Sequence, residues 1–142
     1  MTWKVTKKVS MIQIIPIDMF LHTIVIGVGI TGYDLDLLYY DNVERMTDEE
    51  RKIIKNDITT PSSCNGMTMT LDSGTIFVYI RKGKERDISV VAHELYHAVN
   101  RLLYRVGVRR DEDDEACAYL LGWLMQEYFK QLNEFENENQ KG

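Results

Sequence analysis

The residues best suited to chemistry are two histidines four positions apart, in the segment His93-Glu94-Leu95-Tyr96-His97. Side chains four apart on a helix lie one turn above each other, so His93 and His97 can bind one metal ion. Glu94 is turned about 100° from His93, which places it beside the ion and outside its ligand set. A carboxylate there can accept a proton from a water molecule that the ion acidifies. The spacing therefore predicts a zinc (Zn2+) site with Glu94 as general base.

Such a site needs a third protein ligand and one open position, and a carboxylate is a common partner of two histidines. The acidic run at residues 111–115 supplies candidates. On a helix that begins there, Glu115 shares one face with Tyr119, Gly122 and Gln126. Ala118 borders this face, and its small residues let another helix approach. We predict Glu115 as the third ligand, with Glu112 as the alternative. Asp111 or Asp114 is a candidate for orienting a ligating histidine.

These ligands require two long helices. Asp87 can N-cap a helix that continues to about Arg105, and Gly107 is a suitable stop. On its helical wheel the two histidines lie opposite a broad apolar arc. The arc contains Ile88, Val91, Ala92, Leu95, Ala98, Val99, Leu102 and Leu103. A second helix is predicted from near Asp111, where acidic residues suit the positive end of the helix dipole, to about Leu132.

The rest of the chain predicts a small sheet. Residues 3–17 and 21–29 are rich in β-branched side chains and indicate two strands. Residues 67–71 and 75–80 alternate around a glycine-containing turn, as in a hairpin, and a capping box at Thr47 predicts a short helix to about residue 56. We expect an α+β fold with a small, mostly antiparallel sheet packed against the two long metal-binding helices, plus the short helix.

Length and composition indicate one globular domain. The chain has 142 residues, 44% hydrophobic and 27% charged, which is enough for a sizeable core. We expect a single metallopeptidase-like domain over residues 1–132 and a polar, disordered tail over residues 133–142. The net charge of −5 disfavours nucleic acid and anionic membranes as partners.

The N-terminal apolar stretch and the cysteines favour a cytoplasmic location. The stretch differs from the apolar region of a signal peptide because four residues interrupt it: Gln13, Pro16, Asp18 and His22. The two cysteines, Cys64 in a predicted loop and Cys117 in a predicted helix, are too few for a disulfide framework. We therefore expect free thiols.

Two further features have plainer explanations than a functional site. Residues 27–32 spell G-x-G-x-x-G, but a dinucleotide site needs a helix that opens at the glycines, and we predict only a glycine-rich turn. His22 lies in an apolar strand, where a histidine with satisfied hydrogen bonds is expected rather than a ligand.

Residues 91–98 and 114–123 resemble the helices of minimal gluzincin-like HExxH zinc metallopeptidases, with small phage-encoded domains as the nearest type. The ImmA/IrrE type is more distantly similar, because Leu120 replaces the second alanine of its E-A-x-x-x-A spacing. The resemblance implies Glu115 as third ligand, Glu94 as base, and the strand at residues 75–80 as the edge along which an extended peptide lies.

The resemblance also leaves one role without an obvious residue. No further histidine follows the motif to stabilise the oxyanion. Tyr119 or Tyr104 is the candidate for that role, and packing in the core is the alternative explanation for both side chains.

The sequence thus predicts a zinc-dependent peptidase that acts on a protein or peptide substrate. The alternative is a non-catalytic, metal-stabilised binding protein, for example a phage factor that sequesters a host protein. Both functions use His93, His97 and Glu115, but only the peptidase requires Glu94 and an open coordination position.

Overall fold

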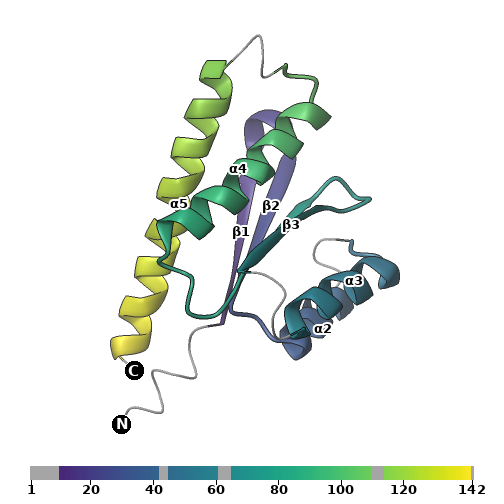
Figure 1. Cartoon of the computed structure of the whole chain (residues 1–142), viewed down its shortest axis with the longest axis vertical. Helices are drawn as coiled ribbons and strands as arrows, with labels where there is room; N and C mark the ends of the chain where they lie inside the picture. The colour runs from purple at the N-terminus through teal and green to yellow at the C-terminus, as the bar shows by residue number, and fades with distance from the viewer. Residues whose placement is uncertain (1–9, 42–44, 61–64, 110–113, 142) are drawn as a thin grey trace.

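The computed structural model describes residues 10–41, 45–60, 65–109 and 114–141, which form an α+β fold, as the sequence predicts (Figure 1). In chain order the elements are β1 (Met11–Ile17), the 3-10 turn η1 (Asp18–Phe20), β2 (His22–Val28), α2 (Gly32–Tyr40), α3 (Asp48–Thr59), β3 (Gly66–Thr70), β4 (Ile76–Ile80), α4 (Ile88–Arg105) and α5 (Asp114–Lys141). The two long helices, the helix capped by Thr47 and the hairpin are confirmed.

Four strands form one mixed sheet in the order β1-β2-β4-β3. β1 and β2 are antiparallel, as are β3 and β4, whereas β2 and β4 are parallel. The expectation that the strand at residues 75–80 lies at the edge is wrong, because β4 lies inside the sheet and β3 forms the edge. Every residue of β4 is buried, which is typical of a strand covered on both faces.

Helices cover both faces of this sheet (Figure 1). Successive side chains of a strand point to opposite faces. On one face Ile26 and Val78 belong to a core shared with α4 and α5. On the other face Val25 and Phe77 belong to a core shared with α2 and α3. The alternation of the two central strands therefore fixes which helices lie on which side.

β1 forms the second edge of the sheet. Its residues alternate between buried and exposed, with Gln13, Ile15 and Ile17 facing inward. Pro16 lies in this strand opposite Thr23 of β2. A proline cannot donate to a strand ladder, so its natural place in a sheet is an edge strand such as this one.

Helix α2 is a difference from the prediction, since it begins at Gly32, inside the segment where we expected only a turn. The Thr31 hydroxyl accepts from the Asp34 N–H at 3.1 Å, and the Asp34 carboxylate accepts the Thr31 N–H at 2.9 Å. Because this carboxylate already occupies the positive end of the helix, a phosphate gains little there. Only Leu35 and Leu38 of the helix are fully buried, so apolar periodicity reveals it poorly.

The start and end of α4 agree with the prediction. The Asp87 carboxylate accepts from the Ser89 hydroxyl and from the backbone N–H groups of Ser89 and Val90, and these bonds hold the pKa of Asp87 below its usual value. Gly107, with φ of +80°, follows the helix end. Ile88 departs from the predicted apolar arc, because it is exposed in the first turn.

Helix α5 continues through residues 133–141, so the disordered tail expected there is not found. Arg86, in the turn before α4, donates to Asn133 Oδ1 at 2.5 Å and pairs with Glu136. Leu132 is buried against the core just before these contacts. A polar composition does not disclose such partners, which come from a segment more than forty residues away.

Two other expectations concern the cysteines and the possibility of a membrane-spanning helix. Cys117 is a free, buried thiol, whereas Cys64 lies outside the described residues. None of the helices in the described part of the chain is both long enough and apolar enough to cross a membrane.

We predict that Tyr128→Phe lowers the free energy of unfolding by about 1 kcal/mol, the usual net contribution of a hydrogen bond. Tyr128 is fully buried and its hydroxyl donates to the Glu85 carbonyl at 2.8 Å, joining α5 to the turn before α4. Urea denaturation measures the change. The control Tyr104→Phe, at a side chain that is 87% exposed, stays within about 0.5 kcal/mol of the wild type. Equal effects of the two substitutions would contradict this role of the hydroxyl.

Candidate metal centre

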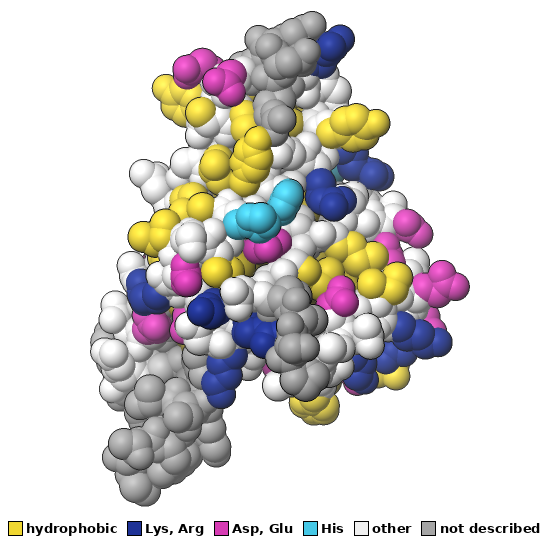
Figure 2. Space-filling model, in the orientation of Figure 1, with side chains coloured by type: hydrophobic (Ala, Val, Ile, Leu, Met, Phe, Trp, Pro, Cys, Tyr) yellow, Lys and Arg dark blue, Asp and Glu magenta, His cyan; other side chains and the backbone are white. Residues whose placement is uncertain are grey.

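The two motif histidines lie together on the exposed face of α4. Their Nε2 atoms are 3.2 Å apart, and the ring planes are inclined by 83°. Figure 2 shows histidine side chains side by side at the molecular surface. Burial of Val91, Leu95 and Ala98 on the opposite side of the helix turns His93 and His97 outward, as the helical wheel predicts.

The distance between these nitrogens fits a shared zinc ion. Zinc binds histidine nitrogen at about 2.0–2.1 Å in a tetrahedral arrangement, which separates two nitrogen ligands by roughly 3.3 Å. The observed Nε2–Nε2 distance of 3.2 Å agrees with that value. The separation of the two Nε2 atoms is therefore the one expected for two ligands of a single zinc ion.

Glu94 lies behind the histidines and is buried, with 7% of its surface exposed. Its Oε1 accepts a hydrogen bond of 2.8 Å from the hydroxyl of Thr68, on the edge strand β3. Its Oε2 lies 3.9 Å from Nε2 of His93. One carboxylate oxygen is thus held by the sheet, and the other faces the histidine pair.

Gly66, at the start of β3, permits this close approach of strand and helix. A Cβ atom there would lie 2.7 Å from the Tyr79 carbonyl oxygen and 2.8 Å from Cγ of Glu94. An open pocket of about 470 Å³ adjoins the site, lined by Asn65, Gly66, Ser89, Val90, His93 and Glu94. Any side chain at position 66 would displace Glu94 or the strand.

Sequence reasoning missed Thr68 and Gly66. The available signal was weak: Thr68 belongs to the strand predicted at residues 67–71, and Gly66 lies at the end of the loop predicted before it. That strand precedes another strand and then the motif helix. Strand order decides whether such a strand lies beside the helix, and strand order depends on long-range pairing.

Two contacts show that α5 runs back along α4. Tyr128 bonds to Glu85, in the turn before α4, whereas Cys117 Sγ lies 4.0 Å from Oδ1 of Asn100, near the other end of α4. The start of α5 therefore lies at the C-terminal end of α4, as Figure 1 also shows.

This arrangement does not bring Glu115 to the histidines. Cys117 lies beside Asn100, which is already three residues past His97, and Glu115 precedes Cys117 on a helix of opposite direction. Glu115 is exposed. Among the residues that the structure describes, no group of three or more His, Cys, Asp or Glu side chains is placed to hold a metal ion.

The other acidic candidates add no ligand within the described chain. Asp114 is exposed in the first turn of α5. Glu112 and Asp111 lie outside the described residues.

The two tyrosines considered for oxyanion stabilisation are both exposed, so the alternative that they pack in the core is wrong. Tyr119, 77% exposed, lines a largely apolar pocket together with Met19 and Phe20 of the β1–β2 connection. Tyr104 lies two turns beyond His97 on the same face of α4. The described residues place neither hydroxyl against the histidine pair.

His22 has the satisfied hydrogen bond that its sequence position predicts. Its Nδ1 lies 2.6 Å from the carbonyl oxygen of Phe20 and donates to it.

Comparison of the chain with protein-family models, with curated proteins and with solved structures finds no match. The functional argument therefore rests on the geometry of the site.

We predict that Thr68→Val destabilises the protein by about 1–3 kcal/mol, because a buried carboxylate oxygen of Glu94 loses its hydrogen-bond donor. The control is Thr70→Val on the same strand, where the hydroxyl accepts only a long 3.4 Å contact from Arg101. Both substitutions change strand propensity alike, so the difference between their urea denaturation curves isolates the bond to Glu94. A difference near zero would show that this bond contributes nothing.

Proposed function

We propose that this protein is a zinc-dependent peptidase that hydrolyses peptide bonds with Glu94 as general base. The observation that carries the proposal is the joint placement of two groups. His93 and His97 present Nε2 atoms 3.2 Å apart, and the second oxygen of Glu94 faces them from 3.9 Å. A pair of structural surface histidines would not need a buried carboxylate beside it.

In this proposal His93 and His97 would hold the zinc ion, and Glu115, which lies away from them in the structure, would be the third ligand. Glu115 joins the site only if the first turn of α5 approaches the histidines, and the free energy of zinc binding favours such an approach. A bound zinc ion supplies a Lewis acid that polarises a peptide carbonyl and acidifies a water molecule.

Glu94 supplies the proton transfers. Thr68 holds Oε1, so Oε2 is the oxygen free to accept a proton from the attacking water. The water oxygen bonds to the carbonyl carbon, the carbon–nitrogen bond breaks, and Glu94 returns the proton to the leaving amine nitrogen. A carboxylate held in one rotamer is pre-organised for both transfers.

The edge strand β3 supports a peptide as the substrate. It is the edge nearest the histidines, since Thr68 of this strand touches Glu94. An extended peptide can add to a free strand edge through backbone hydrogen bonds. β3 thereby takes the role that the sequence assigned to the strand at residues 75–80.

The metal site is tested by the zinc content of the protein. We expect about one zinc ion per chain, with nitrogen and oxygen ligands at about 2.0–2.2 Å in X-ray absorption spectra. His93→Ala or His97→Ala should abolish stoichiometric binding, whereas the control His22→Ala should retain it. Protein that stays metal-free in the presence of zinc would end the proposal.

The third ligand is tested by comparing Glu115→Ala with Asp114→Ala at the same helix end. Glu115→Ala should weaken zinc binding by at least about tenfold, since the loss of an outer partner of a metal ligand already costs 10–100-fold. Asp114→Ala should change it little. Equal zinc affinity of the two variants would remove Glu115 from the ligand set.

A substitution of Glu94 separates a peptidase from a metal-stabilised binding protein. Glu94→Gln should lower peptide turnover on the order of 10²-fold or more, because an amide cannot accept the proton. Zinc content and thermal stability should barely change, since the amide oxygen still accepts from Thr68. The matched control is Glu134→Gln, at an exposed carboxylate on α5. If the Glu94→Gln variant cleaves as the wild type does, the mechanism is wrong. If neither protein cleaves but both retain the biological effect, the metal-stabilised binding protein replaces the peptidase.

A further inference from the structure

A row of basic side chains continues the histidine pair along α4. His93, His97, Arg101 and Arg105 follow one another at intervals of four residues. Each step advances about 6 Å along the helix and about 40° around it. Figure 2 shows Lys or Arg side chains next to the histidines on the same face.

Two contacts place both arginines along the β3–β4 hairpin. Arg101 donates from Nη1 to the Thr70 hydroxyl at 3.4 Å. A Cβ atom built on Gly74, in the hairpin turn, would lie 3.2 Å from Nε of Arg105. The row therefore follows the edge strand, from Thr68 beside Glu94 to Thr70 beside Arg101.

Neither arginine is neutralised by a carboxylate of the described residues. Other cations of this acidic protein have such partners: Arg51 and Lys55 pair with Asp36. Arg105 lies in the last turn of α4, where a cation complements the helix dipole. Arg101 lies one turn further in, and the dipole does not explain its place.

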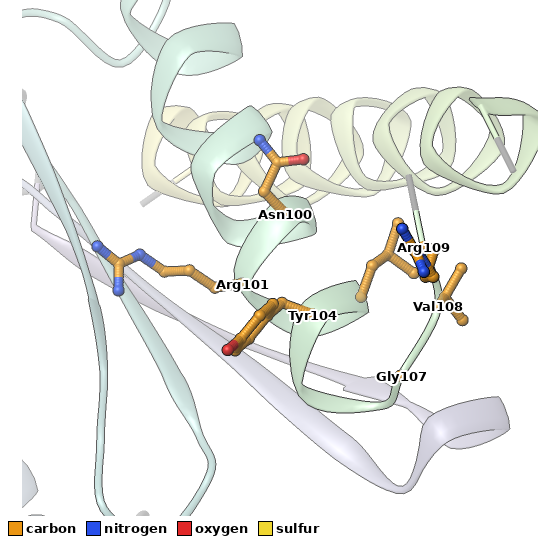
Figure 3. A pocket seen from close by; sticks show the side chains of 7 residues that line it. Asn100, Arg101, Tyr104, Gly107, Val108 and Arg109 are labelled. Carbon is orange, nitrogen blue, oxygen red and sulfur yellow. The ribbon is translucent and has the colours of Figure 1, made fainter. Parts of the chain in front are cut away.

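A hollow of about 640 Å³ lies beside this part of α4 (Figure 3). Asn100, Arg101 and Tyr104 line it from the helix, and Gly107 and Val108 from the turn that follows. In Figure 3 the Arg101 side chain extends away from the axis of α4 on the side of the hairpin. No described residue of the hairpin lines this hollow, but Arg101 is itself exposed, so a side chain next to the edge strand can reach its guanidinium from solvent.

We infer that Arg101 and Arg105 form an anion subsite that selects peptides with acidic residues near the cleaved bond. The inference rests on the proposed peptidase function. An extended peptide advances about 3.3 Å per residue, so Arg101, about 6 Å past His97, meets the second residue from the cleaved bond. Arg105 meets the fourth. A guanidinium binds a carboxylate through paired, charge-assisted hydrogen bonds.

The test uses peptides that differ only in Glu or Gln at the second position on either side of the cleaved bond. For the zinc-loaded wild type, kcat/KM should favour Glu on one side by about fivefold, the size of an exposed ion pair. The preference should shrink as salt is added. Arg101→Gln should abolish the preference, and Arg101→Glu should reverse it in favour of Gln. The control Lys130→Gln, an equal charge change on the exposed part of α5, should keep it.

Binding supplies a second readout that does not depend on turnover. Fluorescence anisotropy of the labelled Glu and Gln peptides should show the same preference with the Glu94→Gln protein, and lose it with Glu94→Gln/Arg101→Gln. Arg101-dependent binding without cleavage by the wild type would uphold the subsite and reject the peptidase. Cleavage without any preference for Glu would reject the subsite and leave the peptidase standing.

Discussion

Burial of one face of α4 against the sheet is the constraint on which the site depends. Val91, Leu95 and Val99 are fully buried in the core shared with the central strands, and this fixes the rotation of the helix about its axis. Because the rotation is fixed, His93 and His97 both face solvent on the opposite side of the helix. A shift of one residue in this packing would rotate the histidines by about 100° about the helix axis. They would then lie away from Thr68, the residue of β3 that binds Glu94.

Glu94 shows how the sheet and helix act on the same side chain. A buried carboxylate is costly unless it is hydrogen-bonded, and β3 provides the bond through Thr68 while Gly66 provides the room. The strand that orders Glu94 is also an edge strand of the sheet that the described residues form. Thr68 therefore links the fold to the proposed proton transfers. Arg101, in the basic row of α4, lies along the same edge strand.

Local patterns in the sequence predict most of the elements, since caps and apolar periodicity act within a few residues. The start of α4 at Asp87 and the outward histidines follow from such patterns. Non-local relations were harder to predict. The edge position of β3 depends on the parallel pairing of β2 with β4. The position of Glu115 relative to the histidines depends on how the antiparallel helix α5 packs along α4. The end of α5 contacts Arg86, a partner far away in the chain.

Pro16 makes the two edges of the sheet chemically unequal. β1 lacks one backbone donor at this position, whereas β3 contains no proline. A foreign strand that docks on β1 loses a ladder hydrogen bond at Pro16, so edge-to-edge pairing of sheets from two molecules is discouraged on that side. Docking is thereby biased toward β3, the edge strand that lies beside the histidine-bearing helix α4.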